Sequence, residues 1–150
     1  MRVVVQRVTQ ASVTINNQIK GEIGLGLLVL AGFTPTDTDE DLKWTAGKVA
    51  QLRIFSDADD KMNLSLQDVQ GDMLVISQFT LFANTKKGNR PSYINAAPPA
   101  IAIPLYEQFI VFLEAALGKK VQTGEFGADM KVALLNDGPV TITIDSQNKE

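Results

Sequence analysis

The chain has 150 residues, a formal net charge of −3, and neither cysteine nor histidine. This length favours one compact domain with a genuine core, and 45% apolar with 21% charged residues is typical of a globular protein. The missing residue types exclude disulfides, thiolate nucleophiles, a serine–histidine–aspartate triad and metal sites built on Cys or His. We therefore expect no metal and no cofactor, and any catalysis must use carboxylates, hydroxyls, Lys, Arg, the backbone or groups of the substrate.

Hydropathy and charge narrow the possible partners. We take residues 23–33 as the longest mostly apolar stretch. It has eleven residues, whereas a membrane span needs about 18. The first residues also lack the apolar region and cleavage site of a signal peptide. We expect a soluble, cytoplasmic protein with no membrane and no DNA partner. The negative charge argues against nonspecific coating of nucleic acids, although a local basic patch can still contact one RNA end.

The first third of the chain predicts three strands and a helix. Between Val3 and Ile15 the odd positions are mostly apolar and the even positions mostly polar, which predicts a long strand with one buried face. The turn signal Asn16-Asn17 precedes a partner strand at 18–23, and the apolar run at 27–33 predicts a buried strand. Acidic residues at 37–41 mark the start of a helix that runs to about Leu52, because negative charge suits the positive end of the helix dipole.

The rest of the chain combines strands with one apolar helix. Strands are expected at 53–55, 73–82, 132–135 and 140–144. Apolar residues at helical spacing predict a helix that begins near Pro104 and ends at Gly118. The expected fold is an α+β domain over residues 1–145, with seven or eight mostly antiparallel strands in a barrel-like sheet and two main helices. A polar tail at 146–150 follows and is expected to fray.

Arg7 shares the inward strand parity of Val3 and Val5. A buried guanidinium is costly unless its donors are satisfied. One interpretation is an arginine that reaches solvent at a strand end, or a shift in the strand pattern near Val8. The other is an arginine that holds backbone carbonyls near a functional site.

The segment at 136–141 (NDGPVT) separates the last two predicted strands. Pro139 has no N–H to donate to a strand ladder, and the bond before a proline adopts the cis form at modest cost. The residues alone favour a plain hairpin turn. The alternative is a rigid Gly138-Pro139 element whose carbonyls contact a ligand.

Polar residues also gather at the end of the strand predicted at 73–82. Ser77, Gln78 and Thr80 can line the mouth of a pocket, but an ordinary strand terminus has the same appearance. Thr80 is a poor nucleophile without a base, and the chain has no histidine to serve as one. The densest basic cluster lies on the following loop and is either solvated surface or a phosphate contact. It consists of Lys86, Lys87 and Arg90.

Five motifs in this order resemble the D-aminoacyl-tRNA deacylase family over essentially the whole chain. They are residues 1–8 (MRVVVQRV), 77–81 (SQFTL), 88–93 (GNRPSY), 123–130 (TGEFGADM) and 136–141 (NDGPVT). The resemblance implies a homodimer that hydrolyses the ester between a D-amino acid and the terminal ribose of tRNA. It also implies removal of glycine mischarged on tRNA, as a proofreading device in translation.

The resemblance assigns roles to particular residues. It implies a cis Gly138-Pro139 bond whose segment reaches into the partner subunit's pocket to select chirality, with Arg7 holding that segment in place. The catalytic group that it implies comprises Ser77, Gln78, Phe79 and Thr80. Pocket-lining roles fall on Phe126, Ala128, Met130 and Asn136. The basic cluster at 86–90 is a candidate contact for the tRNA acceptor end.

Two mechanisms remain open at this point. In one, Thr80 attacks the ester and forms a covalent intermediate. In the other, water attacks with help from the adjacent ribose hydroxyl, and backbone N–H groups of Phe79 and Thr80 stabilise the oxyanion. A non-catalytic dimer that binds an amino-acid-like ligand, and a protein that binds RNA ends without chemistry, are the competing functions.

Overall fold

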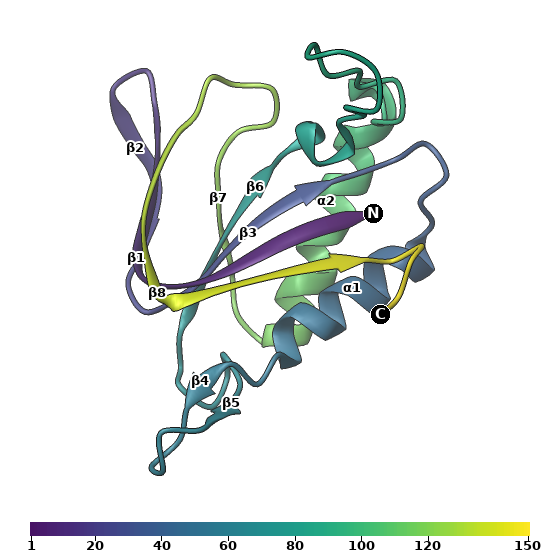
Figure 1. Ribbon diagram of the computed structural model, residues 1–150. Helices are drawn as coiled ribbons and strands as arrows, with labels where there is room; N and C mark the ends of the chain where they lie inside the picture. Colours follow the sequence, from purple (N-terminus) through teal and green to yellow (C-terminus); the bar gives the residue numbers. More distant parts are fainter.

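The computed structural model describes all 150 residues as one α+β domain, in agreement with the expected fold class. Eight strands and two long helices follow one another along the chain (Figure 1). In the first half they are β1 (Arg2–Ile15), β2 (Gln18–Ile23), β3 (Gly26–Gly32), α1 (Asp39–Gln51), β4 (Phe55–Ser56) and β5 (Met62–Leu64). In the second half they are β6 (Asp72–Ser77), the 3-10 helix η1 (Phe79–Phe82), α2 (Pro99–Leu117), β7 (Gln122–Thr123) and β8 (Lys131–Asp145).

The main sheet is mixed and strongly curled. Its order is β2-β1-β3-β6-β7, and β8 pairs with β1 along nearly the whole length of both strands. The pairings of β1 with β2, β3 and β8 are antiparallel, whereas β3–β6 and β6–β7 are parallel. The strands curl around a second apolar cluster of seven buried residues, which include Val8, Val13 and Leu74. This curling gives the barrel-like sheet expected from the sequence.

The main core lies between the sheet and both helices, which pack against each other (Figure 1). The alternation predicted for the first strand holds only as far as Arg7, since Val3 and Val5 are fully buried in this core. At Val8 the pattern shifts: Val8 is buried, Thr9 is exposed, and Ala11 and Val13 lie in the second cluster. From α2, Phe109 and Leu113 are completely buried, and each such side chain contributes about 1.5–3 kcal/mol through the hydrophobic effect.

Helix α2 corrects two expectations. It begins at Pro99 rather than near Pro104, because Pro98 caps it and Pro99 occupies the first turn, where a missing N–H costs nothing. It is also longer than residues 23–33. Its 19 residues reach a mean hydropathy of 1.6, which is enough by length and composition alone to cross a membrane. Most of that stretch is not fully buried, but one face of the helix, which includes Tyr106 and Phe109, belongs to the main core of this domain.

The strand predicted at 73–82 is also corrected, because β6 ends at Ser77 and a turn of 3-10 helix follows. The last ladder bond runs from the N–H of Gln78 to the carbonyl of Ala31 (2.7 Å). Immediately beyond it the chain crosses the end of β3 above Gly32, so closely that a Cβ there would lie 2.8 Å from the Gln78 carbonyl oxygen.

The hairpin expected at 136–139 is absent, because residues 131–145 form one strand. The strand contains a large bulge, in which Gln6 pairs with Thr141 and Val8 pairs with Asn136. One residue of β1, Arg7, therefore lies opposite four residues of β8 (137–140), and β8 bends sharply in Figure 1. Asn136 stabilises the bulge, since its side-chain amide donates to the carbonyls of Arg7 and Val140 (both 3.0 Å).

The remaining differences are small. The strand predicted at 53–55 is β4 at Phe55–Ser56, which pairs with the unexpected β5. Helix α1 begins at Asp39, with Thr38 forming a capping box with Asp41. After β8, Ser146 is buried and its hydroxyl accepts a hydrogen bond from the Met1 ammonium (2.7 Å), so the first residue of the polar tail packs against the domain.

Candidate functional site

A pocket of about 270 Å³ opens where β3 and β6 end. Three of its lining residues belong to the motif at 77–81: Ser77, Gln78 and Phe79. Three more come from the loop before β8 and its surroundings: Phe126, Ala128 and Met130. Two motifs that lie about 50 positions apart in the sequence thus meet at one pocket. The remaining lining residues are Ala31, Gly32, Phe33, Ile76, Ala97, Ala102, Gly127, Asp129 and Val132.

The turn η1 follows directly after Ser77 and Gln78. Phe79 lines the pocket, whereas Thr80 does not. The N–H groups of Phe79 and Thr80 have no hydrogen-bond acceptor within the chain, as expected at the start of a helical turn. The hydroxyl of Thr80 accepts a hydrogen bond from the side-chain amide of Gln78. An amide donor cannot remove a proton from that hydroxyl, so Thr80 has no base next to it.

Tyr106 packs behind two of the pocket-lining residues. The sequence patterns did not identify it. Its hydroxyl donates to the carbonyl of Val75 on β6 (3.1 Å), and its ring packs against Phe33 and Phe126 (ring centroids 6.4 Å and 6.0 Å apart). Burial raises the pKa of Tyr106 to about 12, so its hydroxyl keeps its proton at neutral pH and remains a donor. The sequence patterns did not identify Gly32 either. Both residues matter through contacts between segments that are distant in the sequence.

Arg7 lies inside the fold, as its strand parity indicates, with only 9% of its surface exposed. Its guanidinium donates to the carbonyl oxygens of Ile54 (Nη1, 2.6 Å) and Asp137 (Nε, 3.2 Å), and Nε lies 3.1 Å from the Asp137 carboxylate. The structure therefore supports the interpretation that this arginine holds backbone carbonyls, and it contradicts an arginine that reaches solvent. The shift in the strand pattern near Val8 is also present, since Arg7 and Val8 are both buried and the register with β8 changes there. Arg7 connects the bulge of β8 to the segment after α1.

The peptide bond between Gly138 and Pro139 is cis, as the resemblance implied. Gly138 has a φ of +122°, and a Cβ there would lie 2.9 Å from both Arg7 Nη2 and Val140 Cγ2. A side chain at this position is therefore strained as well as crowded. Gly138 and Pro139 are exposed, and neither they nor Asn136 line the pocket formed by residues 77–79 and 126–132. A single chain thus does not bring the two groups of predicted residues together.

The basic cluster lies on the loop that joins η1 to α2. Lys86, Lys87 and Arg90 are all exposed, and none of them forms an ion pair. The loop begins where the turn of Phe79 and Thr80 ends, so the cluster lies on the same segment as the pocket mouth.

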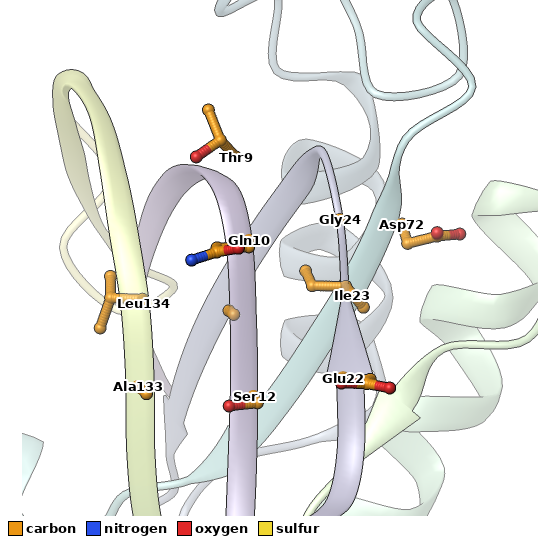
Figure 2. Close-up of a pocket in the computed structure, with 10 residues that line it drawn as sticks. Thr9, Gln10, Ser12, Glu22, Ile23, Gly24, Asp72, Ala133 and Leu134 are labelled. Carbon is orange, nitrogen blue, oxygen red and sulfur yellow. The ribbon is translucent and has the colours of Figure 1, made fainter.

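A larger hollow, of about 610 Å³, lies elsewhere on the molecule (Figure 2). Strands β1, β2 and β8 supply most of its lining, and Asp72 comes from the start of β6. None of the predicted site residues lines it. The chain contains no group of three or more His, Cys, Asp or Glu residues placed to hold a metal ion.

Comparisons with known proteins agree with these motifs. The sequence model of a family described as D-Tyr-tRNA(Tyr) deacylase matches residues 4–145. Proteins named D-aminoacyl-tRNA deacylase from Flavobacterium johnsoniae and Bacteroides fragilis are 62% and 61% identical, with all of both chains covered.

Solved structures show the same fold. One titled c-Myc DNA Unwinding Element Binding Protein matches with a TM-score of 0.90 at 39% identity, covering 97% of this chain and 98% of that one. Another, a probable eukaryotic D-amino acid tRNA deacylase, matches with a TM-score of 0.82 at 21% identity, covering 95% and 97%. At that identity the second likeness supports the fold alone.

The curled α+β domain, whose mostly apolar pocket also includes Ser77 and Gln78, falls in a class of hydrolases that act on aminoacyl-tRNA esters. Within that class, the chain belongs to the D-aminoacyl-tRNA deacylase family.

Proposed function

We propose that this protein hydrolyses the ester of D-aminoacyl-tRNA and releases the free D-amino acid and tRNA, and that it also removes glycine mischarged on tRNA. The observation that carries the proposal is the pocket in which Ser77, Gln78 and Phe79 meet Phe126, Ala128 and Met130, in a chain 62% identical to a named deacylase over its full length. The reaction takes place in the cytoplasm, on aminoacyl-tRNA released by synthetases. One structural relative is named for DNA binding, but our proposal is confined to tRNA.

In the proposed mechanism, water attacks the ester carbonyl directly. The free N–H groups of Phe79 and Thr80 donate to the oxyanion that develops, an interaction worth about 3–4 kcal/mol in enzymes where it has been removed. The carbonyl–oxygen bond to the ribose then breaks, the acyl group keeps the hydroxyl of the water, and the ribose oxygen takes the proton. The neighbouring ribose hydroxyl of the substrate assists this proton transfer, which suits a site without histidine.

Covalent catalysis by Thr80 is the second candidate mechanism. It is disfavoured because the hydroxyl of Thr80 accepts a hydrogen bond from Gln78 and has no base to remove its proton. Gln78 instead holds the Thr80 side chain and so steadies the turn that carries the proposed N–H donors.

Selection of chirality is assigned to the Gly138-Pro139 segment of the partner subunit in a homodimer. Its carbonyls hold the α-amino group, and the rigid segment occupies the space that an L side chain would need. Glycine has no side chain to exclude and is therefore accepted. Two observations support this assignment: the segment is exposed, and it is anchored from within by Arg7. Light scattering should give the mass of a dimer, whereas a monomer under assay conditions would rule out a partner's contribution.

Release of labelled amino acid from D-Tyr-tRNA, L-Tyr-tRNA and Gly-tRNA tests the proposed function. We expect the protein to hydrolyse the D-tyrosyl and glycyl esters and to spare the L-tyrosyl ester. Stability of all three esters in the presence of the protein would refute the proposal.

A further inference from the structure

The chain carries a net charge of −3, yet its substrate in the proposed function is a polyanion. One segment is an exception to this acidic character. Between Asp72 and Glu107 there is no carboxylate side chain, and the only charged side chains there belong to Lys86, Lys87 and Arg90. These three cations are exposed and lack acidic partners. Such local separation of charge favours the binding of an anion at this loop.

Hydrogen bonds close the loop at its base and hold its three basic residues on one short segment. The N–H of Asn84 donates to the carbonyl of Ser92 (2.7 Å), and the N–H of Ser92 donates back (3.0 Å). The Asn84 side chain also accepts from the N–H of Lys86 (3.0 Å), and Gly88 makes the turn with a φ of +68°. The basic residues therefore project from a closed loop.

Exposed aromatic side chains lie between this loop and the pocket. Phe79, which lines the pocket, is 54% exposed, and Tyr93, just beyond the loop, is 39% exposed. Their rings meet edge to face, with centroids 5.1 Å apart. The next residue, Ile94, is 85% exposed. Exposed apolar and aromatic groups beside a functional site are typical of a binding surface.

The one carboxylate that lines the pocket is paired with a lysine, so it does not neutralise the positive charge of the loop. Asp129 lines the pocket, but both of its oxygens accept hydrogen bonds from Lys131 (3.0 Å each). The segment 79–93 thus carries the pocket-lining Phe79, the basic loop and Tyr93, and the contact between Phe79 and Tyr93 joins the base of the loop to the pocket.

We propose that this stretch binds the unpaired 3′ end of the tRNA, upstream of the terminal nucleotide that carries the ester. Bases stack on Tyr93 and Phe79, while phosphates lie against Lys86, Lys87 and Arg90. Aromatic stacking combined with a cationic track is how single strands are bound without dependence on their sequence. The inference rests on the proposed function, because the ester must lie in the pocket for the strand to run along this path.

Binding of uncharged tRNA at several salt concentrations tests the basic loop. Replacing Lys86, Lys87 and Arg90 together by Gln removes three phosphate contacts, so the slope of log affinity against log salt should become shallower by about 2. A matched variant with Lys20, Lys43 and Lys61 replaced by Gln changes the net charge equally and should keep the original slope. Equal slopes for the two triple variants would overturn the proposal.

Substitutions at Tyr93 test the stacking. Tyr93→Ala should weaken the binding of intact tRNA about tenfold, whereas Tyr93→Phe should restore it. With tRNA from which the unpaired 3′ nucleotides have been removed, Tyr93→Ala should bind as the unsubstituted protein does. An equal loss with both tRNAs would overturn the assignment to the 3′ end. Thermal unfolding of each variant separates misfolding from a loss of contact.

These experiments separate the two proposals. If the protein binds tRNA through the loop but hydrolyses no aminoacyl ester, the proposed function fails while this surface stands. If it hydrolyses D-aminoacyl-tRNA while the loop variant keeps the original salt slope, only this inference fails.

Discussion

Thr80 distinguishes the two mechanisms at the scale of a single residue. Its backbone N–H is free, whereas its hydroxyl accepts a hydrogen bond from Gln78. Thr80→Val removes the hydroxyl but keeps the N–H and the shape of the side chain. We predict a single-turnover rate on D-Tyr-tRNA within about threefold of the original, since the proposed chemistry uses only the N–H.

A catalytic nucleophile would behave differently. Its removal costs on the order of 10⁴-fold or more, so a loss of that size in Thr80→Val would favour the covalent mechanism. Thr80→Ser is the control, because it keeps both the hydroxyl and the N–H and should be active under either mechanism.

Arg7 is the second residue whose role is open to measurement. Arg7→Met keeps the apolar stem but leaves the carbonyls of Ile54 and Asp137 without their charged donor. We expect the free energy of unfolding in urea to fall by about 2–4 kcal/mol. Selection against L-Tyr-tRNA should also weaken, because the Gly138 segment loses its anchor.

The matched control is Arg53→Met. Arg53 also donates to a backbone carbonyl, that of Asn63 (2.8 Å), but on an exposed surface. Its loss should cost less than about 1 kcal/mol. Equal costs for the two substitutions would contradict the anchoring role of Arg7.

At the scale of elements, the end of β3 fixes the turn that follows β6. A Cβ at Gly32 would lie 2.8 Å from the carbonyl oxygen of Gln78 and 3.2 Å from Cβ of Leu81. Gly32→Ala should therefore displace η1 and slow deacylation by about 10- to 100-fold. It should also lower the free energy of unfolding by about 1–3 kcal/mol.

Gly47→Ala is the corresponding control. Gly47 lies inside α1 with no atom within 4 Å of the added Cβ, so the substitution should stabilise the protein by about 0.5–1 kcal/mol and leave deacylation unchanged. Undiminished activity in Gly32→Ala would show that the turn tolerates displacement.

The sequence predicted correctly those elements whose formation depends on residues close together in the chain. The first strand and the acidic start of α1 depend on neighbouring residues, and both are confirmed. The single buried face predicted for that strand was wrong, because the burial pattern shifts at Val8, where the register with β8 also shifts. The predicted end of β6 was wrong because the actual end depends on Gly32, which lies 45 positions before Ser77. The hairpin at 136–139 was wrong because its alternative, a bulge held by Arg7 and Asn136, requires contacts with β1.

The same distinction holds for the site. Strand parity placed Arg7 inside, but no periodicity connects residues 77–79 with residues 126–130, and only the resemblance to a family named both groups. Tyr106 escaped notice because helical spacing makes it one apolar position among many. Its contact with Val75 and Phe126 exists only after α2 packs against the sheet.

At the scale of the whole molecule, acid should be the condition that unfolds the protein. Burial by itself raises the pKa of Asp145, but hydrogen bonds from Arg2 and from the N–H of Gln147 outweigh burial and leave the pKa below its usual value. Asp41 follows the same pattern through its bonds with Thr38. Backbone N–H groups lower the pKa of Asp57 and Asp68 as well.

A carboxylate with a lowered pKa stabilises the fold above its unfolded pKa, about 3.9, and loses that contribution as the pH falls through its folded value. Without histidine, no imidazole titrates near pH 6. The melting temperature should therefore stay nearly constant from about pH 7 to pH 5 and decline below about pH 4. In Asp145→Asn the decline should be smaller. A marked change between pH 5 and 7 would contradict this account.

The central claim concerns a pocket with main-chain donors that is completed by a partner's Gly138-Pro139 segment. This pocket hydrolyses the esters of D-amino acids and glycine and excludes those of L-amino acids. The most direct measurement compares the deacylation rates of D-Tyr-tRNA and L-Tyr-tRNA under identical conditions with the unsubstituted protein. We predict that the D ester is hydrolysed at least about 100-fold faster than the L ester. Equal rates for the two esters, or hydrolysis of neither, would contradict the account.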